Sequence, residues 1–151
     1  MLEIRKATTA DVNSIASLFD QYRQFYEQAP DIALATKFIA ERIKRQESTI
    51  LVAKTNNEII GFCQMYPTFC SVEASPIMVL YDLYVDPSAR KAGAGRALMQ
   101  AAFEYAKDNG FTRLYLSTAK TNSAAQTLYE SLGCVRDEQF YYYSLNSSVN
   151  S

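Results

Sequence analysis

The chain has 151 residues, of which 48% are hydrophobic and 21% charged, and its formal net charge is −1. This balance predicts one globular domain over residues 1–145 and a polar tail over 146–151. A nearly neutral chain gives no electrostatic reason to expect nucleic acid, and no apolar run approaches the ~18 residues of a membrane span. Because the N-terminus also lacks a signal-peptide core, we expect a cytoplasmic protein.

The chain has no histidine, and its three cysteines lack the spacing of metal ligands. A histidine-ligated metal centre and any Ser-His or Cys-His nucleophile are thereby excluded. We expect reduced thiols and no metal. Acid–base chemistry then falls to carboxylates, tyrosines, lysines, cysteines or water.

The N-terminal half predicts helices followed by a hairpin. A short alternating strand at residues 3–7 leads into a Thr8–Asp11 capping box and a helix to about Gln28. A second helix is predicted over 32–46. Strands over 49–54 and 58–66 flank an asparagine turn, and a loop is expected over 67–76.

A β-branched and aromatic run, residues 79–85, predicts the central strand, which Asp86-Pro87 ends. Small residues at 92–95 then open a helix that Gly110 closes, and they leave backbone N–H groups unshielded where a phosphate is favoured. Arg90, Lys91 and Arg96 add cationic donors for the same anion. The loop is either ordinary turn geometry or a metal-free pyrophosphate site, because it lacks the Lys-Ser/Thr pair of a P-loop.

The remaining residues predict a strand over 111–118, a helix capped by Thr121 or Asn122 and ended by Gly133, and a last strand over 140–145.

Two segments carry a resemblance to a known family. Residues 90–95, Arg-Lys-Ala-Gly-Ala-Gly, resemble the (Gln/Arg)-x-x-Gly-x-(Gly/Ala) signature of the GNAT N-acetyltransferase superfamily. Residues 122–133 resemble the Asn-x-x-Ala-x-x-x-Tyr-x-x-x-Gly of its following unit. The resemblance implies an α/β GNAT fold: a mixed, mostly antiparallel sheet of about 6–7 strands, helices on both faces and the order β-α-α-β-β-β-α-β-α-β. It also implies a bulge in the central strand.

The resemblance further implies acetyl-CoA as co-substrate and assigns residues to it. The pantetheine is expected on the backbone of Leu83, Tyr84 and Val85. The pyrophosphate is expected on Arg90, Lys91, Ala92, Gly93, Ala94, Gly95 and Arg96. Asn122 is expected on the cofactor arm and Tyr129 near the thioester sulfur.

The implied activity is N-acetyl transfer by direct attack of an amine in a ternary complex. Tyr129 suits the general acid, since a phenol of unperturbed pKa near ~10 is protonated at neutral pH, although its helical spacing equally fits the core. Many relatives have a glutamate where this chain has Tyr81. Asp82 is therefore either a base acting through water or a structural acceptor, and an amine of low pKa needs no base.

The acceptor is predicted to be a small-molecule primary amine: an amino acid, a polyamine or an amine antibiotic. Candidate acceptor residues are Tyr26, Tyr66, Tyr81 and Tyr141. The alternative interpretation is that these tyrosines pack in the core, at a sheet edge or at a dimer contact. The alternatives are a protein or peptide N-acetyltransferase and a non-catalytic acetyl-CoA-binding module. The tyrosine-rich terminal strand predicts a homodimer.

Overall fold

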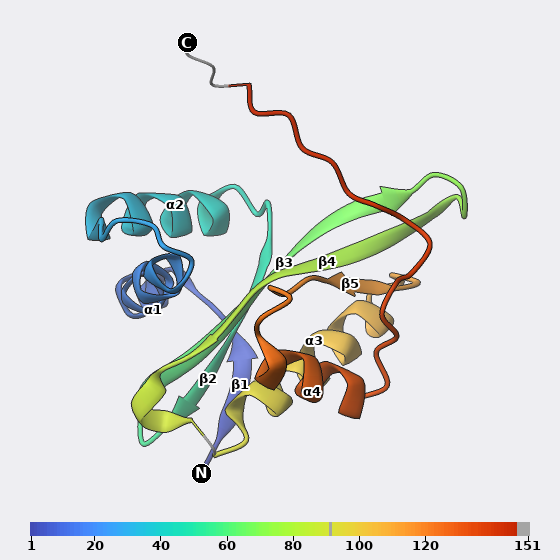
Figure 1. Cartoon of the computed structure of the whole chain (residues 1–151). Coiled ribbons are helices and arrows are strands. Elements are labelled where there is room, and N and C mark those ends of the chain that lie inside the picture. Colours follow the sequence, from blue (N-terminus) through green and yellow to red (C-terminus); the bar gives the residue numbers. More distant parts are fainter. Residues whose placement is uncertain (91, 148–151) are drawn as a thin grey trace. The chain divides into compact units, whose positions relative to one another are not determined.

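A five-stranded sheet runs through the first 117 residues (Figure 1). The computed structural model describes residues 1–90 and 92–147, which divide into Met1–Ser117 and a second unit beginning at Thr118. The strands lie across the sheet in chain order: β1 (Glu3–Lys6), β2 (Thr49–Thr55), β3 (Glu58–Cys70), β4 (Ser75–Val85) and β5 (Leu114–Leu116). Neighbours pair antiparallel except β4 and β5, which are parallel. The predicted mixed, mostly antiparallel α/β architecture is therefore confirmed.

Three α-helices cover the sheet: α1 (Val12–Phe25), α2 (Ile32–Lys44) and α3 (Ala94–Asp108). A 3-10 turn, η1 (Thr9–Asp11), precedes α1 and carries the predicted capping box. In this box the Asp11 carboxylate accepts from the Thr8 N–H at 2.8 Å. Asp31 caps α2 by accepting from the Leu34 N–H at 3.1 Å. Both helices end earlier than the apolar pattern predicts, because Glu27 and Gln46 adopt left-handed backbone angles.

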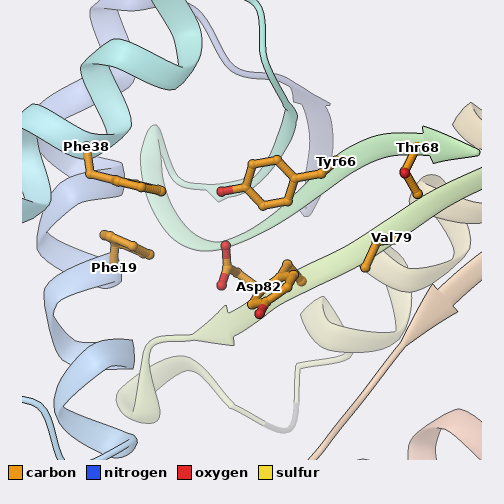
Figure 2. A pocket seen from close by; sticks show the side chains of 7 residues that line it. Phe19, Phe38, Tyr66, Thr68, Val79 and Asp82 are labelled. Atoms are coloured by element: carbon orange, nitrogen blue, oxygen red, sulfur yellow. The ribbon is translucent and has the colours of Figure 1, made fainter. Parts of the chain in front are cut away.

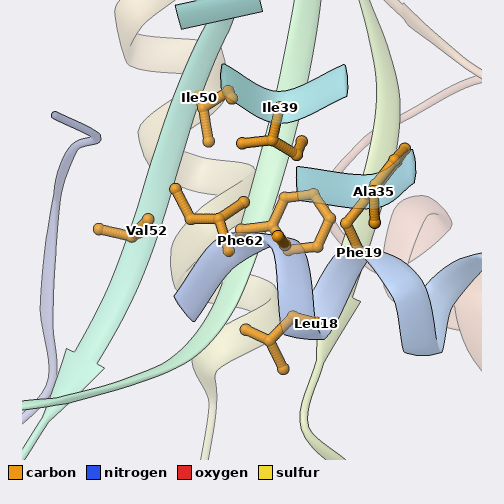
Figure 3. Close-up of a cluster of buried hydrophobic side chains, with 9 residues drawn as sticks. Leu18, Phe19, Ala35, Ile39, Ile50, Val52 and Phe62 are labelled. Atoms are coloured by element: carbon orange, nitrogen blue, oxygen red, sulfur yellow. The ribbon is translucent and has the colours of Figure 1, made fainter. Parts of the chain in front are cut away.

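The two faces of the sheet bury different side chains. Figure 3 shows the cluster beneath α1 and α2, to which β2 and β3 contribute Ile50, Val52 and Phe62. On the opposite face, a side chain built at Gly61 would meet Leu98 of α3 at 3.4 Å. Helices therefore lie on both faces of this sheet, as predicted. Side chains along a strand alternate between the two faces of the sheet, so Gln64 points to the same α1 and α2 side as Phe62.

Three strands differ in length from the prediction: β3 and β4 are longer and β5 is shorter. The loop predicted over 67–76 is wrong, since β3 continues to Cys70 and β4 starts at Ser75, leaving a tight turn with Ala74 at φ 53°. The strand predicted over 111–118 forms only over Leu114–Leu116. Ladder hydrogen bonds to β4 decide this length, because only these residues are in register with Met78–Leu80.

The second unit contains α4 (Ser123–Ser131), with Asn122 as its N-cap and Gly133 in the left-handed region after it. The strand predicted over 140–145 is wrong: Phe140 to Leu145 are irregular and exposed. An aromatic run favours a strand only where another strand pairs with it. Over residues 1–90 and 92–147 the structure has five strands, so the predicted count of 6–7 and the full predicted order are not confirmed. A single domain over 1–145 stays a prediction.

None of the helices within the described ranges is long and apolar enough to cross a membrane.

Candidate active site

A pocket of about 630 Å³ opens on the α1 and α2 face of the sheet (Figure 2). Its walls are mostly aromatic, and its lining comes from two helices and two strands: Phe19, Phe38, Tyr66, Thr68, Val79, Tyr81 and Asp82. The rings of Phe19 and Phe38 stack at 5.4 Å between centroids and so join α1 to α2 at the pocket wall. Asp82 is the one acidic or basic residue in this lining.

A bulge in β4 brings two consecutive side chains into this pocket. Gln64 of β3 pairs with Asp82, whereas Met65 pairs with Leu80, so Tyr81 has no partner on β3. In a regular strand, Tyr81 and Asp82 would point to opposite faces. The extra residue resets the alternation, and both side chains line the same pocket. The bulge predicted for the central strand is therefore present, and the hydroxyl of Tyr22 donates to the freed Tyr81 carbonyl at 3.0 Å.

Asp82 is a buried carboxylate, with 5% of the residue exposed. The Gln64 amide donates to Asp82 Oδ2 at 2.8 Å. Burial raises the pKa of Asp82, while hydrogen bonds from Gln64 and Tyr22 lower that pKa and so offset part of the effect. A carboxyl group whose pKa lies above its usual range is a better proton acceptor near neutral pH than an exposed one.

Two of the four predicted acceptor residues meet at this pocket. The rings of Tyr66 and Tyr81 lie edge to face with centroids 5.9 Å apart, and Tyr81 is 68% exposed. Burial and the nearby Asp82 raise the pKa of Tyr66 to about 12, so its phenol is neutral at physiological pH. In Figure 2 the Tyr66 hydroxyl and the Asp82 carboxyl point toward the same space in front of Phe19 and Phe38.

The other two predicted acceptor residues are not placed there. Tyr26 is absent from the lining and instead packs against Tyr22 and Phe25, each at 5.2 Å between ring centroids. Tyr141 belongs to the second unit and is 89% exposed. Sequence reasoning missed Phe19 and Phe38 as lining residues, because aromatic residues on an amphipathic helix have the pattern of a core.

The segment after β4 forms the predicted loop between strand and helix. The Asp86 carboxylate accepts from the Ser88 N–H at 2.9 Å and starts a 3-10 turn, η2 (Pro87–Ala89). Arg90 folds back, its Nε donating to the Val85 carbonyl at 2.9 Å and its guanidinium lying 5.2 Å from the centre of the Tyr84 ring. Lys91 lies outside the described residues.

The start of α3 has the backbone that the glycine signature predicts. Gly93 is the N-cap and has φ +85°, a backbone conformation that residues other than glycine rarely adopt. Ala92 and Arg96 are exposed and Gly95 is half-buried, whereas Ala94 is packed against the sheet. The helix thus presents its N-terminal end beside small residues and a cation, which is a favourable place for an anion.

The edge of β4 is open next to this helix start. The parallel pairing covers Met78–Leu80 and Leu114–Leu116 and stops at the bulge. Within the described part of the chain, no strand pairs with Leu83, Tyr84 or Val85 on this side. The Val85 carbonyl accepts from Arg90 Nε, and the other backbone groups on this side are placed for an extended ligand that hydrogen-bonds like a strand.

The second unit holds the remaining predicted site residues. The Asn122 side chain accepts from the Ala125 N–H at 3.1 Å, a capping role that the sequence also predicts. Tyr129 is half-buried on α4. Their predicted places at the cofactor arm and at the thioester sulfur stay predictions. No cluster of three or more His, Cys, Asp or Glu side chains that could hold a metal occurs among the residues that the structure describes.

The family model for the acetyltransferase (GNAT) family matches residues 13–134. YhfO of Bacillus subtilis (strain 168), an uncharacterized N-acetyltransferase, is 48% identical over 145 residues, which cover 96% of this chain and 97% of YhfO. The crystal structure of a probable acetyltransferase is 35% identical, with a TM-score of 0.90 and coverage of 98% of this chain and 99% of that one.

An aminoglycoside N-acetyltransferase solved in complex with CoA shares the fold at 18% identity, with a TM-score of 0.82 and coverage of 96% and 95%. These similarities extend over the sheet, the glycine loop and the helices described above. This chain belongs to the acetyltransferase (GNAT) family, which uses acetyl-CoA.

Proposed function

We propose that this protein acetylates the primary amine of a small molecule, by direct attack of that amine in a ternary complex with acetyl-CoA. The observation that carries the proposal is the buried Asp82 carboxylate in an aromatic pocket on β4. The class of acceptor is an amino acid, a polyamine or an amine antibiotic. The relative that was solved with CoA acts on aminoglycosides, which supports an amine-bearing small molecule.

The pocket has the chemistry of an ammonium site. The faces of aromatic rings attract a cation, and a carboxylate pairs with it. The pocket offers the Asp82 carboxylate and four aromatic rings, those of Phe19, Phe38, Tyr66 and Tyr81. A cavity of about 630 Å³ is in the range of small-molecule sites. An alkylammonium group fits this combination better than a neutral or anionic group does.

The reaction needs two protons to leave the amine nitrogen and one to reach the sulfur, and chain residues can perform these transfers. Asp82 accepts a proton from the bound ammonium through a water molecule and leaves a neutral, nucleophilic amine. When acetyl-CoA is bound, it supplies the thioester that the amine attacks. Tyr129 donates its phenolic proton to the departing sulfur, and its phenolate recovers the second proton, which the nitrogen loses as the amide forms. The donation contributes roughly 10²–10⁴-fold if it is typical of general acids.

The residues around the glycine loop fit the co-substrate. The open edge of β4 suits the amide groups of a pantetheine arm, and the left-handed Gly93 and the start of α3 suit a pyrophosphate. We assign the following residues to acetyl-CoA: Leu83, Tyr84, Val85, Arg90, Lys91, Ala92, Gly93, Ala94, Gly95, Arg96, Asn122 and Tyr129.

The proposal is tested by incubating the protein and acetyl-CoA with a panel of polyamines, aminoglycosides, amino acids and short peptides, with detection of acetylated products by mass. Mass detection avoids dyes that react with thiols, because the chain has three free cysteines. We expect product from a small amine. Product from peptides alone would move the activity to peptide N-termini, and no product while acetyl-CoA still binds would indicate a non-catalytic module.

We also propose that the chain works as a homodimer in the cytoplasm. The exposed aromatic residues from Phe140 to Tyr143 support the dimer, since such a run is favourable to bury against a second copy.

A further inference from the structure

Behind the pocket, two polar side chains, Gln64 and Ser48, form a row that leads away from Asp82. Ser48, directly before β2, donates through its hydroxyl to Gln64 Oε1 at 2.7 Å. Gln64 Nε2 donates to Asp82 Oδ2 at 2.8 Å. Gln64 is completely buried, two positions from Phe62 and on the same face of β3. The row therefore runs from the residue before β2 through β3 to the carboxylate on β4.

The direction of each hydrogen bond follows from the ionised carboxylate. An ionised carboxylate has no proton to give, so Gln64 must turn its NH₂ group toward Asp82. The amide carbonyl then faces the other way and needs a donor, which the Ser48 hydroxyl provides. The carboxylate thus selects the amide orientation, and the Ser48 hydroxyl, which rotates to donate, satisfies the carbonyl end of the amide in that orientation.

We propose that Gln64, whose amide carbonyl accepts from Ser48, is a positioning residue of the acceptor site that holds one oxygen of Asp82 and thereby fixes the carboxylate plane toward the pocket. The inference rests on the proposed role of Asp82. Gln64 itself is buried behind the carboxylate and is not among the residues that line the pocket.

The burial of Gln64 indicates that its role is more than packing. A buried amide costs free energy unless both its donor and its acceptor are paired, and an apolar side chain of similar length would avoid that cost. In this core an amide gains little as filler, and what it uniquely provides is a donor to Asp82.

Two titratable groups near Asp82, Tyr66 and Cys63, keep their own protons near neutral pH. Asp82 faces Tyr22 from α1, Tyr66 from β3 and its neighbour Tyr81, while Cys63 lies next to Gln64 on the other face of β3. The pKa values of Tyr66 and Cys63 are both raised to about 12. Arg42 and Glu47 act on Tyr66 in opposite directions and pair with each other at 2.9 Å.

The test is the pKa of the Asp82 carboxyl, followed by ¹³C NMR in the full-length protein and assigned with Asp82→Asn. Gln64→Met keeps the length of the side chain and removes the donor, so we expect the pKa of Asp82 to rise. Ser48→Ala releases the amide, and we expect a smaller rise. Met65→Leu, on the opposite face of β3, is the matched control and should leave the Asp82 pKa unchanged.

An unchanged Asp82 pKa in folded Gln64→Met overturns the proposal, and Ser48→Ala decides by the same criterion if Gln64→Met fails to fold. With the best amine, kcat of Gln64→Met should fall roughly ten-fold with KM little changed, and the acid limb of its pH profile should move to higher pH. Lack of turnover in the wild type would reject the proposed function, whereas the NMR comparison would still decide the role of Gln64.

Discussion

At the scale of single residues, the pocket depends on one extra residue in β4. In a strand without this bulge, Asp82 would point to the face that α3 covers, away from the aromatic pocket. The bulge turns the carboxylate toward the aromatic wall, and Tyr22 stabilises that backbone by donating to the Tyr81 carbonyl. An uncommon backbone irregularity is thus used to place one charged group.

Replacing Tyr129 by phenylalanine should lower kcat ten-fold or more and leave the Kd of acetyl-CoA unchanged, since only the proton donor is lost. Turnover is followed by product mass and binding by calorimetry. Tyr105→Phe in α3, which loses a hydroxyl contact to Thr49, serves as the control. Equal turnover of Tyr129→Phe and the wild type would show that another group protonates the sulfur.

Asp11 should stabilise the fold through Arg5, which donates to both carboxylate oxygens at 2.8 and 3.0 Å. This hydrogen-bonded pair lowers the pKa of Asp11 to about 2. Because the folded pKa is depressed, the stabilisation is present above the ordinary value near 3.8 and is lost as the pH falls toward 2.

We therefore expect Asp11→Asn to lower the free energy of unfolding by roughly 2 kcal/mol at pH 7 and by much less at pH 2.5, as measured by urea denaturation. Glu41→Gln removes only surface ion pairs and should change stability by no more than about 0.5 kcal/mol. A deficit of Asp11→Asn that is the same at both pH values would contradict this account.

At the scale of elements, the sequence predicted the caps and turns, whose structure depends on neighbouring residues. The Thr8 box, the asparagine turn and the left-handed Gly110 are all present, because each depends on a few neighbouring residues. The ends of β3 and β4 and the length of β5 were not predictable in this way. They depend on which backbone groups find a ladder partner, and that pairing is non-local.

The candidate site was predictable to the same extent. Asp82 and Tyr66 carried recognisable chemistry on predicted strands, whereas Phe19 and Phe38 reached the pocket only through the packing of α1 on α2. Gln64 gave no sequence signal, since its partner lies 18 positions away along the chain.

The two ends of α3 offer a matched pair of glycine variants. Gly93 and Gly110 have φ +85° and +82°, and a side chain at either would meet nothing within 4 Å. Gly93→Ala and Gly110→Ala should each therefore cost about 1 kcal/mol of stability through backbone strain.

Only Gly93→Ala should weaken acetyl-CoA binding, by several-fold in calorimetry, because only this glycine begins the helix end assigned to the pyrophosphate. Equal Kd values for the two variants would contradict that assignment.

At the scale of the whole molecule, the exposed aromatic segment is the basis of the proposed homodimer. We expect elution at twice the 17.0 kDa chain mass in gel filtration with light scattering. Replacing Tyr141 and Tyr143 by serine should shift the equilibrium toward the monomer, because less apolar surface is buried. A wild type that elutes at one chain mass at all concentrations would rule out the dimer.

The most direct test of the central claim compares the wild type with Asp82→Asn on the best amine of the panel. The amide keeps the shape of the carboxylate and its place beside Gln64 but cannot accept the ammonium proton. We predict a loss of roughly 100-fold in kcat/KM near pH 7, with acetyl-CoA binding unchanged. If Asp82→Asn acetylates that amine at the rate of the wild type, the carboxylate is not the base and the central claim is contradicted.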